Sequence, residues 1–298
     1  MSAPRVLVAG GANVDVKVTA SGPTADGIST PGRVHVVPGG VARNVAEALA
    51  RLGATVRLLT VVGADAWGEW MMTQTALAGV DTTAAIRDPG QTGFYVAIGG
   101  HGVADATIVE ATPAEVWLRA PREDTDLVVL DANPAEATLP ELARRASRLA
   151  LVGTSPAKVS RLRSLLPHAW LVCLTLTEAR VLMGPKGGML EGAALARAVQ
   201  ALGPEWVLLT EGQSGLGLLG KAWTAAPAQP GLVINETGAG DTAAALVMFG
   251  LLRGWFAERV LLLAARAATM TLGVWGNVHP EVGTVLIEGG PHDPAESL

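Results

Sequence analysis

The feature that most constrains the fold of this chain is a repeated alternation of short apolar runs with helical patterns. The apolar runs, rich in Val and Leu, cover residues 6–9, 56–62, 127–130, 149–152, 170–174 and 206–210. Strands of this kind, followed each time by a helical segment, are typical of a parallel sheet whose two faces are both covered by helices. The sequence therefore predicts an α/β fold with a doubly wound, mostly parallel sheet.

The clearest helical pattern begins directly after Gly39 and Gly40. Its apolar residues repeat at helical spacing and form one stripe, made of Val41, Val45, Ala48, Leu49 and Leu52. Gly53 follows the stripe and is typical of a helix C-terminus. The first turn of this helix is thus expected to start at a pair of glycines.

Two segments interrupt the alternation, at about residues 14–38 and 91–109. The first has alternating valines before a turn rich in Gly, Pro, Ser and Thr, and the second contains the strand-like stretches 94–98 and 107–109. Both are expected to form strands outside the main sheet, as a small β lid over one edge of the core. Because the sequence contains no internal repeat and no linker that would divide it into two domains, residues 1–298 are expected to form a single domain.

Charge and composition exclude several classes of function. The chain has 22 basic and 27 acidic residues, a formal net charge of -5 and no basic tract, so it is not expected to bind nucleic acid. Its longest uncharged apolar stretches are about half the roughly 20 residues that span a bilayer, so no membrane segment is expected. The single cysteine, Cys173, lies in an apolar run, where we expect a buried thiol and a cytoplasmic protein.

The most informative stretch is the segment of residues 235–242. It follows the strand-like residues 232–234 and opens the apolar helical segment 243–252. Gly238, Ala239 and Gly240 can expose several amides at the positive end of a helix, which makes a hole for an anion. Asp241 is then placed to accept a proton from a hydroxyl that attacks a phosphate. The alternative is a glycine turn with Asp241 as an ordinary helix N-cap.

Two further segments carry polar residues near the predicted sheet. Asn13 and Asp15 follow the first strand, where side chains can face a polyhydroxylated ligand, and Asp15 can accept hydrogen bonds from two neighbouring hydroxyls. Asn44 lies one turn into the helix after Gly40, and Arg43 can supply a fork of donors. Taken alone, the first segment is equally compatible with a turn in which Asn and Asp serve backbone needs.

These residues belong to a set of motifs by which the chain resembles the ribokinase-like (PfkB) family of carbohydrate kinases along nearly its whole length. The motifs are Gly-Gly-x-Asn-x-Asp (10–15), Gly-Gly-x-x-x-Asn-x-Ala (39–46), Val-Gly-x-Asp-x-x-Gly (62–68), Thr-x-Gly-x-x-Gly (210–215) and Thr-Gly-Ala-Gly-Asp (237–241). Within the family, residues 13–17, 31–34 and 39–44, together with Asn235 in place of an aspartate, resemble the branch that acts on pseudouridine. The resemblance implies a kinase for a primary hydroxyl, with the 5′-hydroxyl of pseudouridine as the first expectation. Other nucleosides, or free sugars of the ribose or fructose type, remain alternatives.

The resemblance also implies a set of site residues and cofactors. ATP is the implied phosphoryl donor, with Mg²⁺, and the lid is implied to pair two subunits into a homodimer. Asp241 is implied as the catalytic base, with Gly238, Ala239 and Gly240 as the anion hole. The implied substrate contacts are Asn13, Asp15, Lys17, Gly39, Gly40, Arg43 and Asn44. The implied nucleotide contacts are Thr210, Gly212, Gly215 and Thr237, and Glu178 is implied to help organise Mg²⁺ indirectly.

Three segments depart from the family pattern. Thr175 stands where the family has the asparagine of Asn-x-x-Glu, and the segment Gly153-Thr154-Ser155-Pro156 stands where many relatives carry Asp-Pro. Glu236 lies near the place where some members bind a monovalent cation. These departures leave open both the handling of Mg²⁺ and the dependence on a monovalent cation. They also motivate an alternative of another class, a nucleoside- or sugar-binding protein that has lost the chemistry.

Overall fold

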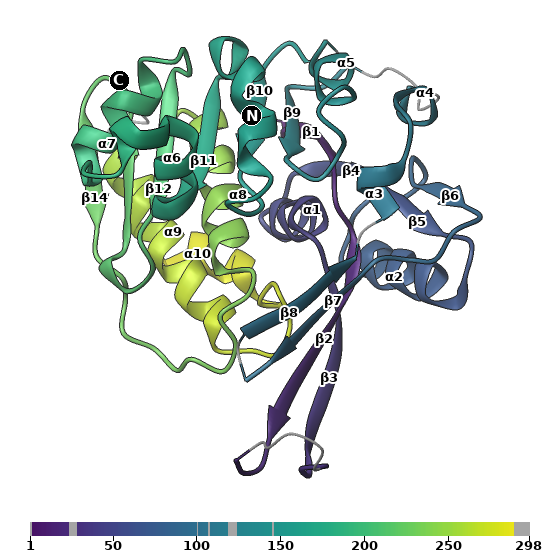
Figure 1. Ribbon diagram of the computed structural model, residues 1–298. Coiled ribbons are helices and arrows are strands. Elements are labelled where there is room, and N and C mark those ends of the chain that lie inside the picture. Colours follow the sequence, from purple (N-terminus) through teal and green to yellow (C-terminus); the bar gives the residue numbers. More distant parts are fainter. Residues whose placement is uncertain are drawn as a thin grey trace.

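A computed structural model describes residues 2–23, 29–99, 101–106, 108–118, 124–144 and 146–288. Within this part of the chain, a central sheet of eight strands has the order β14-β13-β12-β11-β10-β9-β1-β4 (Figure 1). The six strands from β4 to β12 pair in parallel, whereas β13 and β14 are antiparallel additions at one edge. The predicted α/β fold with a mostly parallel sheet is confirmed. The strands are β1 (Arg5–Ala9), β4 (Thr55–Leu59), β9 (Leu127–Asp131), β10 (Leu149–Val152), β11 (Leu171–Thr175), β12 (Trp206–Thr210), β13 (Leu216–Leu219) and β14 (Trp223–Ala226).

The central sheet separates two hydrophobic cores, because successive side chains of a strand point to opposite faces. In β1, Val6 and Val8 belong to one core and Leu7 and Ala9 to the other. The first core is covered by α1 (Val41–Arg51), α2 (Ala66–Leu77), α8 (Ala239–Leu252), α9 (Ala257–Leu272) and α10 (Val285–Glu288). The second is covered by α5 (Leu139–Ala143), η1 (Val159–His168), α6 (Leu176–Met183) and α7 (Gly192–Gln200). Helices on both faces make the sheet doubly wound.

A second sheet of four strands, which we call the lid sheet, extends away from the core (Figure 1). Its order is β3-β2-β7-β8, with β2 (Asn13–Ala20), β3 (Gly32–Gly39), β7 (Phe94–Ile98) and β8 (His101–Ala106). The expectation of strands outside the main sheet at these two segments is confirmed. Residues 24–28, 100 and 107 of the two segments lie outside the described residues.

Three predicted strands differ from the observed structure. Residues 108–109 belong to the short helix α3 (Ile108–Ala111), where Val109 is buried in the second core, and Thr107 lies outside the described residues. The run 56–62 divides at Thr60, whose hydroxyl donates to the carbonyl of Gly10 at 2.7 Å. Its second part, β5 (Val61–Gly63), pairs instead with β6 (Ile86–Asp88). Residues 232–234 form no strand, and Leu232 and Val233 are exposed.

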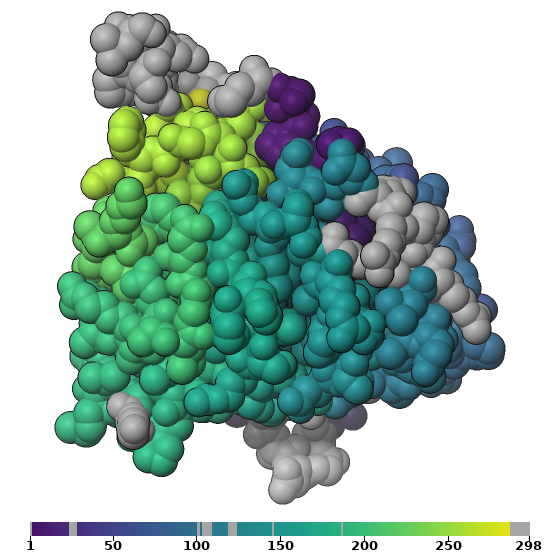
Figure 2. All heavy atoms as spheres, turned by 90° about the horizontal axis from the view of Figure 1, so that it is seen from above, coloured from purple at the N-terminus to yellow at the C-terminus, as the bar shows by residue number. Residues whose placement is uncertain are grey.

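The remaining helices are short connections around the core. They are α4 (Ala114–Trp117), η2 (Gly184–Gly187), η3 (Gly212–Ser214) and η4 (Val282–Thr284). Seen from above, the chain follows the sheet order across the molecule, from the blue segments of the first hundred residues at one side to the green segments near β12 at the other (Figure 2). No helix of the described residues is long and apolar enough to cross a membrane. Cys173, on β11, is a buried thiol as expected, and burial raises its pKa.

Candidate active site

Asp241 lies in the first turn of α8, beside the start of α1. The Nδ2 atom of Asn44 donates to Oδ2 of Asp241 at 2.8 Å, so the two residues meet although 197 positions separate them. The N-cap of α8 is Gly238, and Asp241 follows three positions later. The alternative in which Asp241 itself caps the helix is therefore wrong. Asp241 lies instead within the first turn, where it is half-buried and accepts the hydrogen bond from Asn44.

The loop before α8 has the backbone geometry of an anion site. Gly238 has a φ of +89°, and a Cβ atom there would lie 1.9 Å from the carbonyl oxygen of Asn277. No side chain caps this end of α8. Gly240 is exposed, and a Cβ atom there would meet nothing within 4 Å. An exposed helix N-terminus without a side-chain cap, at the positive end of the helix dipole, is typical of anion sites.

The electrostatics around Asp241 favour the protonated carboxyl. Its pKa is raised to about 7, in the first place because burial penalises the charged form. The hydrogen bond from Asn44 opposes this shift, whereas the nearby carboxylates of Asp131, Glu178 and Asp15 add to it. A carboxyl whose pKa lies near neutrality can both accept and return a proton at physiological pH. This property is typical of general bases.

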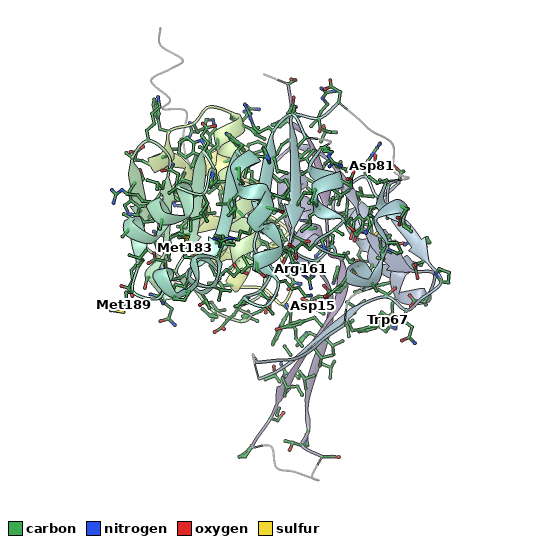
Figure 3. The ribbon with its side chains drawn as sticks, turned by 45° about the horizontal axis from the view of Figure 1, so that its top comes forward. Asp15, Trp67, Asp81, Arg161, Met183 and Met189 are labelled. Atoms are coloured by element: carbon green, nitrogen blue, oxygen red, sulfur yellow. The ribbon has the colours of Figure 1, made fainter. Side chains whose placement is uncertain are left out.

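Asp15 lies at the junction of the lid sheet and the core (Figure 3). Its Oδ1 accepts from Nδ2 of Asn13 at 2.6 Å, and its Oδ2 accepts from Nδ2 of Asn277 at 2.7 Å. Lys17, on the same strand, donates from Nζ to the side-chain oxygen of Asn277 and to the carbonyl of Trp275 at 3.0 Å. Burial raises the pKa of Asp15 and lowers that of Lys17 to about 8. The structure thus brings Asn13, Asp15 and Lys17 together.

The glycine pair before α1 is needed for close backbone packing. A Cβ atom at Gly39 would lie 2.0 Å from Oδ1 of Asp15. Gly40 has a φ of +94°, and a Cβ atom there would collide with the backbone of Gly11 and Ala12. Only glycines let the start of α1 approach Asp15 so closely. The pair therefore fixes the position of Asn44, one turn further along the helix.

Arg43 differs from the exposed donor that its position suggests, because it is only 3% exposed. One of its terminal nitrogens, Nη1, donates to the carbonyl of Pro38 at 2.7 Å and to Oδ1 of Asn44 at 2.9 Å. The other, Nη2, forms an ion pair with Glu47. These contacts hold the Arg43 side chain against Asn44, while direct contact with a substrate stays a prediction.

The four residues predicted on the nucleotide side lie in two segments, at the β12–β13 connection and before α8. Thr210 ends β12, and Gly212 has a φ of +57° with open space where a side chain would be. Gly215 has a φ of +104°, and a Cβ atom there would lie 2.2 Å from the carbonyl oxygen of Ala226. The turn into β13 therefore requires a glycine at this position. The amide of Thr237 donates to Oδ1 of Asn235 at 3.1 Å. Their contacts with a nucleotide stay predictions.

Glu178 is held at the N-terminus of α6 by a capping box. Its Oε2 accepts from the amide of Thr175 at 2.8 Å, and the Thr175 hydroxyl accepts from the amide of Glu178 at 3.2 Å. An added Cβ at Gly153 would lie 2.3 Å from Oε2 of Glu178. The two departures from the family pattern therefore act on one carboxylate: Thr175 anchors it and Gly153 leaves room for it. Burial raises the pKa of Glu178.

Two residues that the sequence reasoning missed hold the site together. Asp131, at the end of β9, is buried and accepts from the amides of Gly11 and Ala42 at 2.9 and 3.0 Å. It could have been found, because it follows a predicted strand at the carboxyl edge of the sheet. Asn277 donates to Asp15 and to the carbonyl of Pro38, at 3.0 Å, from a segment with no recognisable pattern.

The donor set of the site is compatible with a magnesium ion that a nucleotide shares. No group of three or more His, Cys, Asp or Glu residues in the described part of the chain could hold a metal by itself. Mg²⁺ in phosphoryl-transfer sites needs only one or two protein carboxylates and takes its other ligands from phosphates and water. Glu178 is suited to that role, because a bound cation would favour the charged form of its carboxyl group, whose pKa is raised by burial.

The comparisons with known proteins identify the family of the chain. The model of the pfkB family carbohydrate kinases matches residues 3–281, so the chain belongs to that family. A pseudouridine kinase from Escherichia coli is 29% identical over 275 residues, which are 86% of each chain. A carbohydrate kinase from Agrobacterium tumefaciens has a TM-score of 0.79 and 27% identity over 96% of this chain and 97% of its own.

A ribokinase from Arabidopsis thaliana, solved with ribose and ATP, supports the fold. It has a TM-score of 0.78 and 22% identity, over 97% of this chain and 99% of its own. The fold and the family together define a phosphotransferase that acts on a sugar or a nucleoside.

Proposed function

We propose that the chain is an ATP-dependent kinase that phosphorylates the primary hydroxyl of a pentose-containing substrate, the 5′-hydroxyl of pseudouridine. The observation that carries this proposal is the pairing of Asn44 with Asp241 at an uncapped helix end. A carboxyl with a pKa of about 7 there lies beside amides that can bind a phosphate. Family membership supports the reaction class, and the similarity to a pseudouridine kinase supports the substrate.

Asp241 acts as the general base in this proposal. The substrate hydroxyl lies against the carboxylate, which accepts its proton as the oxygen attacks the γ-phosphate in line. Asn44 donates to one carboxylate oxygen and leaves the other for the hydroxyl. The amides of Gly238, Ala239 and Gly240 stabilise the charge on the transferred group. Mg²⁺, held with the help of Glu178, neutralises charge on the phosphates when it is bound.

Asp15 orients the pentose. Each of its carboxylate oxygens accepts one amide hydrogen in the structure, from Asn13 and from Asn277. A carboxylate offers about four acceptor sites, so two remain for neighbouring sugar hydroxyls. The two amides fix the carboxylate plane, and a fixed plane lets the site present one particular hydroxyl to Asp241.

The proposal is tested by measuring ADP release from MgATP with pseudouridine, uridine, adenosine, inosine, ribose and fructose. We expect the highest kcat/KM with pseudouridine, and uridine is the matched control because it differs only in the atom that joins base and sugar. A higher kcat/KM with ribose or another nucleoside would overturn the substrate but keep the kinase. No ADP with any compound, together with thermal stabilisation by a nucleoside, would favour the non-catalytic binding protein.

A further inference from the structure

The segment of residues 273–279, which we call the C-terminal strap, connects the two halves of the site. Its Asn277 donates to Asp15, and its Trp275 carbonyl accepts from Lys17 of the lid sheet. The Asn277 carbonyl packs against Gly238 so closely that no side chain fits between them. A displacement of the C-terminal strap would therefore move both the predicted substrate residues around Asp15 and the predicted anion hole at Gly238.

Asn235 fixes the C-terminal strap to the loop that precedes α8. The residue is 9% exposed, and its Nδ2 donates to the carbonyls of Thr237 at 3.3 Å and Gly276 at 3.2 Å. Its Oδ1 accepts from the amide of Thr237 at 3.1 Å. These partners determine which side-chain atom is the nitrogen, because the opposite assignment would place an oxygen against two carbonyl oxygens.

The chemistry of this position changes if the residue is an aspartate, which the family resemblance implies for most relatives. A carboxylate oxygen would then face the carbonyl oxygens of Thr237 and Gly276 with no hydrogen between them. Three converging oxygens form a donor set for a hard cation. In this chain the Asn235 amide already supplies two hydrogens to the two carbonyls, so a monovalent cation does not fit among these atoms.

We propose that the amide of Asn235 replaces a monovalent cation in joining the loop before α8 to the C-terminal strap. Stability and catalysis are then both independent of potassium, and the statement on catalysis rests on the proposed kinase function. The amide donates hydrogen bonds to the two carbonyl oxygens that a cation would otherwise coordinate. The loop before α8 and the C-terminal strap are therefore held together without a bound ion. The proposal answers for this chain the question of cation dependence that Glu236 raises in the sequence.

The test compares the wild-type protein with Asn235→Asp in potassium chloride and in tetramethylammonium chloride at equal ionic strength. Wild-type Tm and kcat are expected to be the same in both salts. Asn235→Asp is expected to have a lower Tm in tetramethylammonium and to regain about 2–4 °C in potassium, because a cation that binds only the folded state stabilises it. Glu236→Gln, which changes an exposed neighbouring charge, is the control and is expected to behave as the wild type.

The melting temperatures need no kinase activity, so they test the cation proposal separately from the proposed function. A potassium-dependent rise of Tm in the wild type would overturn the proposal, and this result does not depend on whether the variant folds. A folded Asn235→Asp protein that is indifferent to potassium would overturn it as well. An inactive wild-type protein with the expected melting temperatures would contradict the kinase function alone.

Discussion

Asp241 shares its surroundings with three other carboxyl groups, those of Asp15, Asp131 and Glu178. All three raise its pKa, after burial, which has the largest effect. A single hydrogen bond, from Asn44, acts in the opposite direction. These opposed contributions make the protonation of Asp241 adjustable by single substitutions at neighbouring residues.

The pH profile of kcat/KM should show how such substitutions change the pKa of Asp241. Below its pKa Asp241 is protonated and cannot accept a proton, so kcat/KM is expected to fall on the acid side of about pH 7. Asn44→Ala removes the contact that lowers the pKa, so the midpoint should move to higher pH. Glu178→Gln removes a like charge, so the midpoint should move to lower pH. Midpoints that stay unchanged, or move in the same direction in both variants, would contradict the assignment of this limb to Asp241.

The residues of the site were predictable to different degrees. Asp241, Asp15 and Asn44 lie in local motifs with glycines beside them, and the structure brings all three into one site. Asn277 lies 262 residues from the Asp15 that it contacts, and one asparagine in an irregular segment carries no periodic signal. The burial of Arg43 was not predictable either, because its partner Glu47 looks in the sequence like an ordinary surface residue of a helix.

At the scale of the element, the two glycines at the start of α8 serve different purposes. Gly238 is required by its positive φ and by its packing against Asn277, whereas Gly240 is in ordinary helical backbone with open space beside it. The first glycine therefore serves the fold, and we propose that the second keeps the predicted anion hole open.

Gly238→Ala and Gly240→Ala form a matched pair that tests this difference. Gly238→Ala should lower Tm by several degrees, because an alanine there is strained and lies against a carbonyl oxygen. Gly240→Ala should keep the wild-type Tm but lose at least about tenfold in kcat/KM for ATP, because its methyl group enters the anion hole. Equal melting temperatures for the two variants, or full activity of Gly240→Ala, would be inconsistent with these roles.

Elements were predictable where their pattern was long or flanked by glycines, as for α1. Short apolar runs were less informative. Residues 108–109 looked like a strand but form part of α3, because Val109 can reach the second core from a helix as well. Leu232 and Val233 looked like a strand and are exposed, since the chain at that point runs outside the sheet. Periodicity alone does not distinguish these cases.

At the scale of the whole molecule, the lid sheet presents an apolar edge. Val34 and Val36, two residues apart on β3, are 61% and 37% exposed, and β3 is the first strand of its sheet. Exposed edge strands with apolar side chains are typical pairing surfaces. We therefore propose that two copies of the chain associate through the lid sheet, as the family resemblance implies.

Sedimentation velocity should show a dimer for the wild type and a monomer for the double variant Val34→Lys with Val36→Lys. The charges would oppose pairing of two like edges and leave the core untouched, so Tm of the isolated subunit should change little. Leu77→Lys replaces an apolar residue at the end of α2 that is even more exposed, and this variant should remain dimeric. A wild-type monomer, or a variant that stays dimeric, would contradict association through the lid sheet.

The most direct test of the account is the single-turnover rate of Asp241→Asn with MgATP and pseudouridine, measured together with the calorimetric affinity for pseudouridine. Asparagine keeps the shape of the side chain and an acceptor for Asn44 but cannot take the proton. We predict a rate lower by about 10²–10⁴-fold and an affinity within a few-fold of the wild type. A variant that transfers phosphate at nearly the wild-type rate would show that Asp241 is not the base.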